Sequence, residues 1–218
     1  MKNRLIIYFI GLLMVVFAIA ETAQAERLVS GEVTGLWTRE ASPYTLTGPT
    51  NVPDHAELVI EPGVRVRSRQ GDALIIYGRL IAEGTEEDSI IFVPVGWLPF
   101  WGGVRFFDAD SGSRLSYCVF RQGQRLPGSQ GDTLRSGGNM LLWHSDVTIN
   151  HSSFLDGEAA FSGGGLAIIG GASTISNCLF QNNTGYVAGG VSCLDSCQTT
   201  FDNCDFRANS ADWGGGGG

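Results

Sequence analysis

The chain has 218 residues, a formal net charge of −8 and 31 glycines. An acidic surface repels phosphate backbones, so this charge argues against nucleic acid as a partner. The glycines follow no Gly-X-Y period, which excludes collagen. With 43% hydrophobic residues beside them, they indicate turns in a folded β protein rather than disorder. We expect one domain with a sizeable core.

The N-terminus has the layout of a secretory signal peptide. Lys2 and Arg4 precede the uncharged apolar run 5–20, and Ala-Gln-Ala at 23–25 is a small-x-small cleavage site. The alternative is a retained membrane anchor, but the run is shorter than the ~20 apolar residues that span a bilayer. We expect residues 1–25 to be removed and no transmembrane segment in the rest of the chain.

Short runs with β-branched residues follow, and in the second half of the chain they recur every 26 residues. Phe154, Phe180 and Phe206 keep this spacing, as do pairs of glycines. A period of 20–50 residues indicates a solenoid or a propeller. Each period holds two or three short strands, separated by Gly, Asn or Asp, and no helical stripe. A propeller blade needs ~40 residues, so the period favours a parallel β-helix.

Equivalent side chains of such a coil stack at the strand spacing of about 4.8 Å. Phe120 lies 34 residues before Phe154, and the eight extra residues fit an inserted surface loop within 123–131. We expect two interior ladders, separated by two residues and therefore sharing a direction. They consist of Phe120, Phe154, Phe180 and Phe206, and of Cys118, Ser152, Cys178 and Cys204.

The corners of the coil are expected where residues tolerate a positive φ. Three residues after each ladder phenylalanine stand glycine or asparagine, the residues that adopt this conformation most readily. These are Gly123, Gly157, Asn183 and Asn209. The recurring glycine pairs mark a second corner.

Residues 29–123 contain Ile60-Glu61-Pro62-Gly63 and the segment LIAEGT at 80–85. This stretch resembles the N-terminal part of secreted right-handed parallel β-helix proteins of the Bacteroidetes and Chlorobi type. The later GG…NCxF…N units are similar to polymorphic outer-membrane-protein repeats. The resemblance implies a secreted or cell-surface protein, often longer than this one, and we interpret the chain as an N-terminal fragment.

We therefore predict an all-β fold, a right-handed parallel β-helix in the form of a single-stranded solenoid. Residues 26–57 are expected to form an N-terminal cap with a leading strand. Residues 58–218 are expected to form the rungs. A stacked solenoid needs a polar cap at each end, and no cap sequence follows Gly216, so we expect the rungs to be truncated at the C-terminus.

The cysteines leave two interpretations open. Cys193 and Cys197 are four residues apart, and export would permit a small loop disulfide between them. Cys178 and Cys204 would lie one rung apart, where buried free thiols are favoured over a disulfide. The paired CxxC or Cys/His spacing of a zinc site is absent from the sequence.

The sequence indicates neither a catalytic group nor a cofactor. Glycoside hydrolysis uses two carboxylates ~5–9.5 Å apart, and no column of acids appears when the units are aligned. Asp202 with Asp205, or Asp108 with Asp110, would suit calcium only if they are not ordinary solvated acids, and no specific calcium motif is present. The three histidines are interpreted as turn or solvent positions rather than catalytic groups. They are His55, His144 and His151.

The aromatic cluster Trp97, Phe100 and Trp101 is the best candidate for a ligand contact. If exposed, these rings would stack on sugars; if buried, they would plug the coil, and burial is the favoured alternative. The expected function is structural, adhesive or glycan-binding, at the cell surface or outside the cell, with a polysaccharide or protein as partner. The alternative is a polysaccharide lyase or glycoside hydrolase that acts on acidic glycans. To bind such a polyanion, the protein would need a local basic patch that offsets its overall negative charge.

Overall fold

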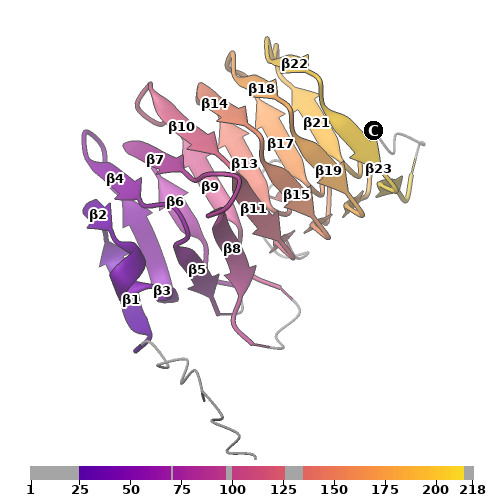
Figure 1. Cartoon of the computed structure of the whole chain (residues 1–218). Helices are drawn as coiled ribbons and strands as arrows, with labels where there is room; N and C mark the ends of the chain where they lie inside the picture. The colour runs from indigo at the N-terminus through magenta and orange to yellow at the C-terminus, as the bar shows by residue number, and fades with distance from the viewer. Residues whose placement is uncertain (1–24, 70, 97–99, 126–134, 214–218) are drawn as a thin grey trace, which may run out of the picture.

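The computed structural model describes residues 25–69, 71–96, 100–125 and 135–213. Their strands stack side by side along one axis, from the N-terminal end to the C-terminal end of the molecule (Figure 1). All named strand pairs are parallel, and the coil has about six turns. The prediction of an all-β parallel β-helix is confirmed. The expected signal peptide lies almost wholly outside the described residues.

Three faces enclose the core, and the chain visits them in the same order in each complete turn. Face 1 contains β6 (Leu74–Ile76), β9 (Val104–Phe107), β13 (Met140–Trp143), β17 (Leu166–Ile169) and β21 (Val191–Leu194). Face 2 contains β2 (Gly35–Trp37), β4 (Glu57–Ile60), β7 (Arg79–Glu83), β10 (Ser113–Ser116), β14 (Val147–Asn150), β18 (Thr174–Ser176) and β22 (Thr200–Asp202). Face 3 contains β5 (Arg65–Ser68), β8 (Ile90–Pro94), β11 (Cys118–Arg121), β15 (Ser153–Leu155), β19 (Leu179–Gln181) and β23 (Asp205–Arg207).

Shorter elements complete the turns. A small sheet contains β12 (Gln124–Arg125), β16 (Glu158–Ala159), β20 (Thr184–Gly185) and β24 (Ser210–Ala211). At the N-terminal end, the long strand β3 (Tyr44–Val52) pairs with both β5 and β6 and so joins faces 1 and 3. Strand β1 (Arg27–Glu32) pairs with β3, and the 3-10 helix η1 (Arg39–Ala41) lies between β2 and β3. The expected cap region therefore contributes strands to the sheets.

A column of phenylalanine rings fills the interior behind face 3. Consecutive ring centroids are 4.7, 5.0, 4.8 and 5.0 Å apart, and the rings are nearly parallel. The column contains Phe92, Phe120, Phe154, Phe180 and Phe206. The first four are fully buried, whereas Phe206 in the last described coil is 40% exposed. Burial of each ring stabilises the fold by roughly 1.5–3 kcal/mol.

A second interior ladder runs beside the phenylalanines. Cys118, Ser152 and Cys178 are buried, and Cys204 is half-buried. The Ser152 hydroxyl accepts a hydrogen bond from the Cys118 amide at 3.1 Å and donates to the Asn150 carbonyl at 2.8 Å. The polar member of the ladder is therefore satisfied by backbone groups.

The corner prediction was wrong by one residue. Positive φ occurs two residues after each ladder phenylalanine, at Gln122, Asp156, Asn182 and Ala208. The next asparagines, Asn183 and Asn209, point inward instead and bond backbone groups between coils. Asn183 Oδ1 accepts from the Gly157 amide at 2.9 Å, and its Nδ2 donates to the Phe154 carbonyl at 2.9 Å. The asparagine amides thus satisfy the backbone inside the corner.

Candidate functional site

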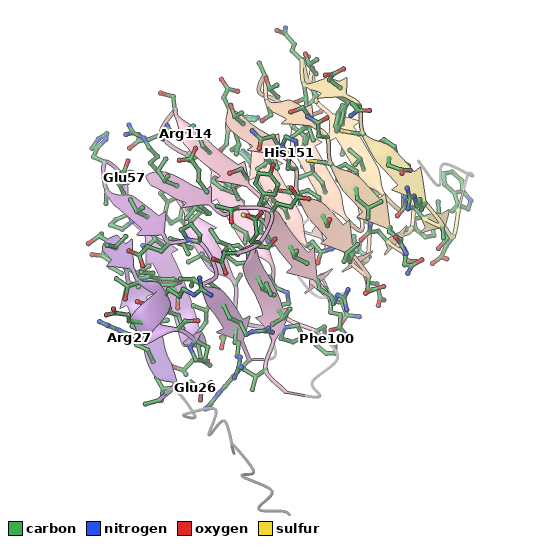
Figure 2. All side chains as sticks on the ribbon, viewed as in Figure 1. Glu26, Arg27, Glu57, Phe100, Arg114 and His151 are labelled. Carbon is green, nitrogen blue, oxygen red and sulfur yellow. The ribbon has the colours of Figure 1, made fainter. Side chains whose placement is uncertain are left out.

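The aromatic residues singled out in the sequence do not form an exposed cluster among the described residues. Trp101 is 1% exposed, its ring lies parallel to Phe92 at 6.4 Å, and its Nε1 donates to the Arg121 carbonyl at 2.9 Å. Its ring is therefore not accessible to a ligand. Phe100, labelled in Figure 2, is half-buried near the end of β8. Trp97 lies outside the described residues.

The outer side of face 1 carries a different set of aromatic rings, which we call the aromatic row: Tyr77, Phe107 and Trp143. Strand alternation directs the preceding residues, Phe106 and Leu142, into the core, so Phe107 and Trp143 point outward. Ring centroids are 6.3 Å apart for Tyr77 and Phe107 and 6.2 Å apart for Phe107 and Trp143. The row thus presents one ring on each of three successive coils.

The aromatic row rests on a fixed base. Leu141, Ala167 and Ile169 are almost fully buried on the same outer side, in contact with Phe107 and Trp143. Tyr77 remains 38% exposed, and Phe107 and Trp143 are half-buried. Side chains held by packing on a sheet lose little conformational entropy when a ligand binds. The row is therefore preorganised.

A turn with charged side chains follows the aromatic row. Asp108 and His144 each directly follow an aromatic of the row and adopt φ of +44° and +43°. His144 Nδ1 lies 3.6 Å from Asp108 Oδ1, and both side chains are more than half exposed. The Asp110 amide donates to the Tyr77 carbonyl at 3.0 Å, and its carboxylate accepts from the His55 amide at 2.9 Å. Hydrogen-bond acceptors thus border the exposed rings.

A surface hollow of about 360 Å³ lies between faces 2 and 3. The ring of Tyr117 stacks on that of His151 at 4.8 Å, and both residues have positive φ. His151 is exposed, in the middle of the view in Figure 2. Glu86, Tyr117, His151, Ser152, Ser153, Asn177 and Leu179 line this hollow. It combines an aromatic surface with hydroxyl, amide and carboxylate groups, and it is the second place where a sugar could bind.

All five cysteines carry free thiols in this structure. Burial raises the pKa of Cys118 far above its usual range and that of Cys178 to about 12. Burial and a hydrogen bond with Cys197 raise the pKa of Cys193 to about 12. Burial also acts on Cys197, but hydrogen bonds with Thr199 and Cys193 outweigh it and lower the pKa of this thiol. Interaction between the two thiols therefore shifts their pKa values in opposite directions.

The acids considered for calcium lie apart from any larger ligand set. Within residues 25–69, 71–96, 100–125 and 135–213, no three His, Cys, Asp or Glu side chains are grouped so that they could hold a metal ion. Asp205 is paired with Arg207, and Asp108 with His144. None of the helices in the described part of the chain has the length and apolar character needed to cross a membrane.

Residues 100–217 match the family model for the right-handed β-helix region. The match covers more than half of the chain, so the protein belongs to this family of right-handed parallel β-helices. No curated protein and no solved structure matches the chain. Membership of this family defines the architecture but not the function, which depends on the outer surfaces of the coil.

The aromatic row was not predicted from the sequence, because its members do not follow the 26-residue period. Tyr77 and Phe107 are 30 residues apart, and Phe107 and Trp143 are 36 apart. A usable pattern does exist: each of the three directly follows a large apolar strand residue (Ile76, Phe106 or Leu142), where alternation turns one of two neighbours outward. Pairing across the coils was needed to show that the outward rings align.

Proposed function

We propose that the protein is an exported β-helix that binds a polysaccharide, and that its role at the cell surface or outside the cell is structural or adhesive rather than catalytic. The aromatic row of Tyr77, Phe107 and Trp143 is the observation that carries this proposal. Aromatic rings bury the apolar faces of sugars and leave sugar hydroxyls free for hydrogen bonds. A rigid coil suits display because its ligand surface cannot collapse.

The direction of the aromatic row favours a polymer as ligand. Its rings come from adjacent strands of face 1, which are spaced about 4.8 Å apart along the coil axis. An extended glycan that lies parallel to this axis meets a new ring on each coil. Multiple weak stacking contacts along one chain add up to useful affinity.

The charges beside the aromatic row favour an uncharged glycan. Asp108 and Asp110 accept hydrogen bonds from sugar hydroxyls but repel carboxylated or sulfated sugars. The facing groups are the imidazoles of His144 and His55. We infer that the ligand of this face is a neutral polysaccharide.

Export and the surface location rest on the N-terminal sequence. Lys2, Arg4, the apolar run 5–20 and the small-x-small motif at 23–25 support secretion of the chain. The resemblance to Bacteroidetes and Chlorobi β-helix proteins and to polymorphic outer-membrane-protein repeats supports the same location. N-terminal sequencing of protein from the culture medium or the envelope fraction tests cleavage after Ala25, and a mature chain that still begins at Met1 contradicts it.

Binding is tested with Trp143→Ala on an array of uncharged glucans, mannans and xylans. Loss of the ring is expected to lower the affinity about tenfold, since a stacked aromatic contributes about 0.5–1.5 kcal/mol besides its buried area. Trp213→Ala is the matched control, because Trp213 is also exposed but stacks on Tyr186 outside the row. Equal binding by both variants, or no bound glycan at all, contradicts the proposal.

The alternative function is a polysaccharide lyase or glycoside hydrolase, and the pair of Asp108 and His144 beside the aromatic row is the observation that favours it. The release of reducing or unsaturated ends from neutral and acidic polysaccharides decides between the two functions. Turnover that survives repurification and disappears in His144→Ala would replace the binding function with an enzymatic one.

A further inference from the structure

The outer side of face 3 carries two guanidinium groups without a carboxylate partner. Arg65 and Arg67 alternate with buried residues in β5, so both side chains point outward. The residues paired with them on adjacent strands are uncharged: Arg67 lies between Thr45 and Val93, and Arg65 lies beside Ile91. The acid next to this surface is Glu26, whose carboxylate accepts a hydrogen bond from the Thr45 hydroxyl. Within the part of the chain that the structure describes, no ion pair joins either guanidinium to an acid.

Arg105 donates to backbone carbonyl groups, and Arg27 lies over the ring of Tyr44. Five other arginines have guanidinium groups that face acids, most of them from other coils. The pairs are Arg39–Asp88, Arg79–Glu57, Arg114–Glu83, Arg121–Asp156 and Arg207–Asp205. In a chain with a net charge of −8, acids are abundant, so two adjacent unpaired guanidinium groups stand out. They also repel each other, and a bound anion would relieve that repulsion.

These two arginines line a hollow of about 350 Å³. Among the described residues, Val93, Pro94, Gly96 and Gln122 also line it, so three successive coils contribute through β5, β8 and the turn after β11. The Gln122 backbone is fixed, since its amide donates to the Leu155 carbonyl at 3.1 Å and its carbonyl accepts from the Trp101 amide at 3.2 Å. The side-chain amide of Gln122 makes no hydrogen bond to another described residue and can donate to a ligand.

We propose that Arg65, Arg67 and Gln122 form a binding site for an oxyanion, the carboxylate or sulfate group of an acidic sugar in a polysaccharide. The planar guanidinium donates two parallel hydrogen bonds to such a group, and two guanidinium groups with one amide suit a single anion. The overall negative charge disfavours densely charged polymers, whereas a pocket receives one anionic group at a time. This site is separate from the aromatic row, so it goes beyond the proposed function and does not depend on it.

The test compares Arg65→Gln/Arg67→Gln with Arg79→Gln/Arg114→Gln, which removes the same charge from face 2. The probes for the full chain are two sparsely charged acidic polymers, dextran with few carboxymethyl groups and dextran with few sulfate groups, and uncharged dextran, with inorganic sulfate as a competitor. The wild-type chain is expected to bind both acidic polymers, more weakly as salt rises. Loss of the two guanidinium groups is expected to lower that affinity tenfold or more, and the control variant is expected to keep it. Circular dichroism confirms that each variant is folded.

Three outcomes overturn the site. The first is equal loss of affinity in both double variants, which would indicate a general charge effect. The second is equal retention in both, and the third is a wild-type chain that binds neither acidic polymer. Binding of inorganic sulfate alone would overturn the assignment to a polysaccharide. Because Trp143→Ala leaves Arg65 and Arg67 untouched, failure of the aromatic row and failure of this site are distinguishable.

Discussion

The C-terminal coils and the N-terminal coils follow the same path but differ in regularity. From β14 onward, paired residues such as Thr148 and Thr174, or Ser153 and Leu179, are 26 apart on faces 2 and 3. Before β14 the offset between paired residues ranges from 17 residues, for Arg27 and Tyr44, to 36, for Val104 and Met140. The two regions stack into one core, so regular spacing is not required for a continuous coil.

This difference in regularity suggests that the regular coils mainly stabilise the fold and that the irregular coils carry the surface features for function. The regular coils repeat the interior residues, namely phenylalanine, the cysteine or serine, and the inward asparagine. The irregular coils carry most of the outward features, including Tyr77, Phe107, Asp108 and the arginine pair of β5. Insertions and deletions occur at corners, where they change the surface and leave the pairing of the interior residues intact.

The largest effect is expected from Phe180→Asp. Phe180 is fully buried between Phe154 and Phe206, at 4.8 and 5.0 Å. An unpaired charge there costs more than the roughly 3–5 kcal/mol of losing the ring, so the regular coils should unfold. Circular dichroism and limited proteolysis measure this. Phe206→Ala is the matched control with a much smaller loss, and unchanged thermal stability of Phe180→Asp would contradict the buried column.

A smaller loss is expected from Gly164→Ala in the regular coils. A Cβ at Gly164 would collide with the backbone of Thr184 on the next coil, and such overpacking costs about 3 kcal/mol. Gly48→Ala in the irregular region is the control, since its Cβ would meet only Ser30 at 3.8 Å. Urea denaturation compares the two free energies of unfolding. A Gly164→Ala chain as stable as Gly48→Ala would show that the coils can move apart.

Asn183→Ala is expected to destabilise the chain by about 2 kcal/mol, because it leaves the buried Gly157 amide without its partner and removes the hydrogen bond from Nδ2 to the Phe154 carbonyl. Asn150→Ala is the control, because the side chain of this asparagine lies on the outer side of β14 and contacts the His151 ring at the surface. Thermal unfolding of both variants gives the difference. Equal midpoints would mean that water replaces the inward amide.

The mildest test leaves the sequence unchanged and measures thiol alkylation by iodoacetamide as pH rises. Thiolates are the reactive form, so Cys197, with its lowered pKa, should be modified first and at the lowest pH. Cys118 and Cys178 should stay unmodified up to about pH 9 in the folded chain, because burial raises their pKa values. Peptide mass spectrometry identifies the order. Early alkylation of Cys178 would show that the regular coils open to solvent.

The sequence was sufficient for the interior because stacking demands like residues at like positions. Phe120, Phe154 and Phe180 recur at the spacing of the coils, and that recurrence alone indicated a parallel solenoid. The corner prediction failed because glycine and asparagine serve two purposes. An asparagine is suited both to a positive φ and to an inward hydrogen bond, so the sequence does not tell which of the two neighbours, Asn182 or Asn183, takes which position. Only the fold shows that Asn182 adopts the positive φ.

The outer surfaces were decided by the tertiary structure. Nothing in the local sequence distinguishes the buried Trp101 from the half-buried Trp143. The alignment of Tyr77, Phe107 and Trp143 depends on offsets of 30 and 36 residues, which differ from the 26-residue period. The arginines of β5 are unpaired because Thr45 and Val93 flank Arg67 across the sheet. Interior contacts repeat along the chain and can therefore be predicted from the sequence. Surface sites join unrelated segments from different coils, so they exist only once the coil has formed.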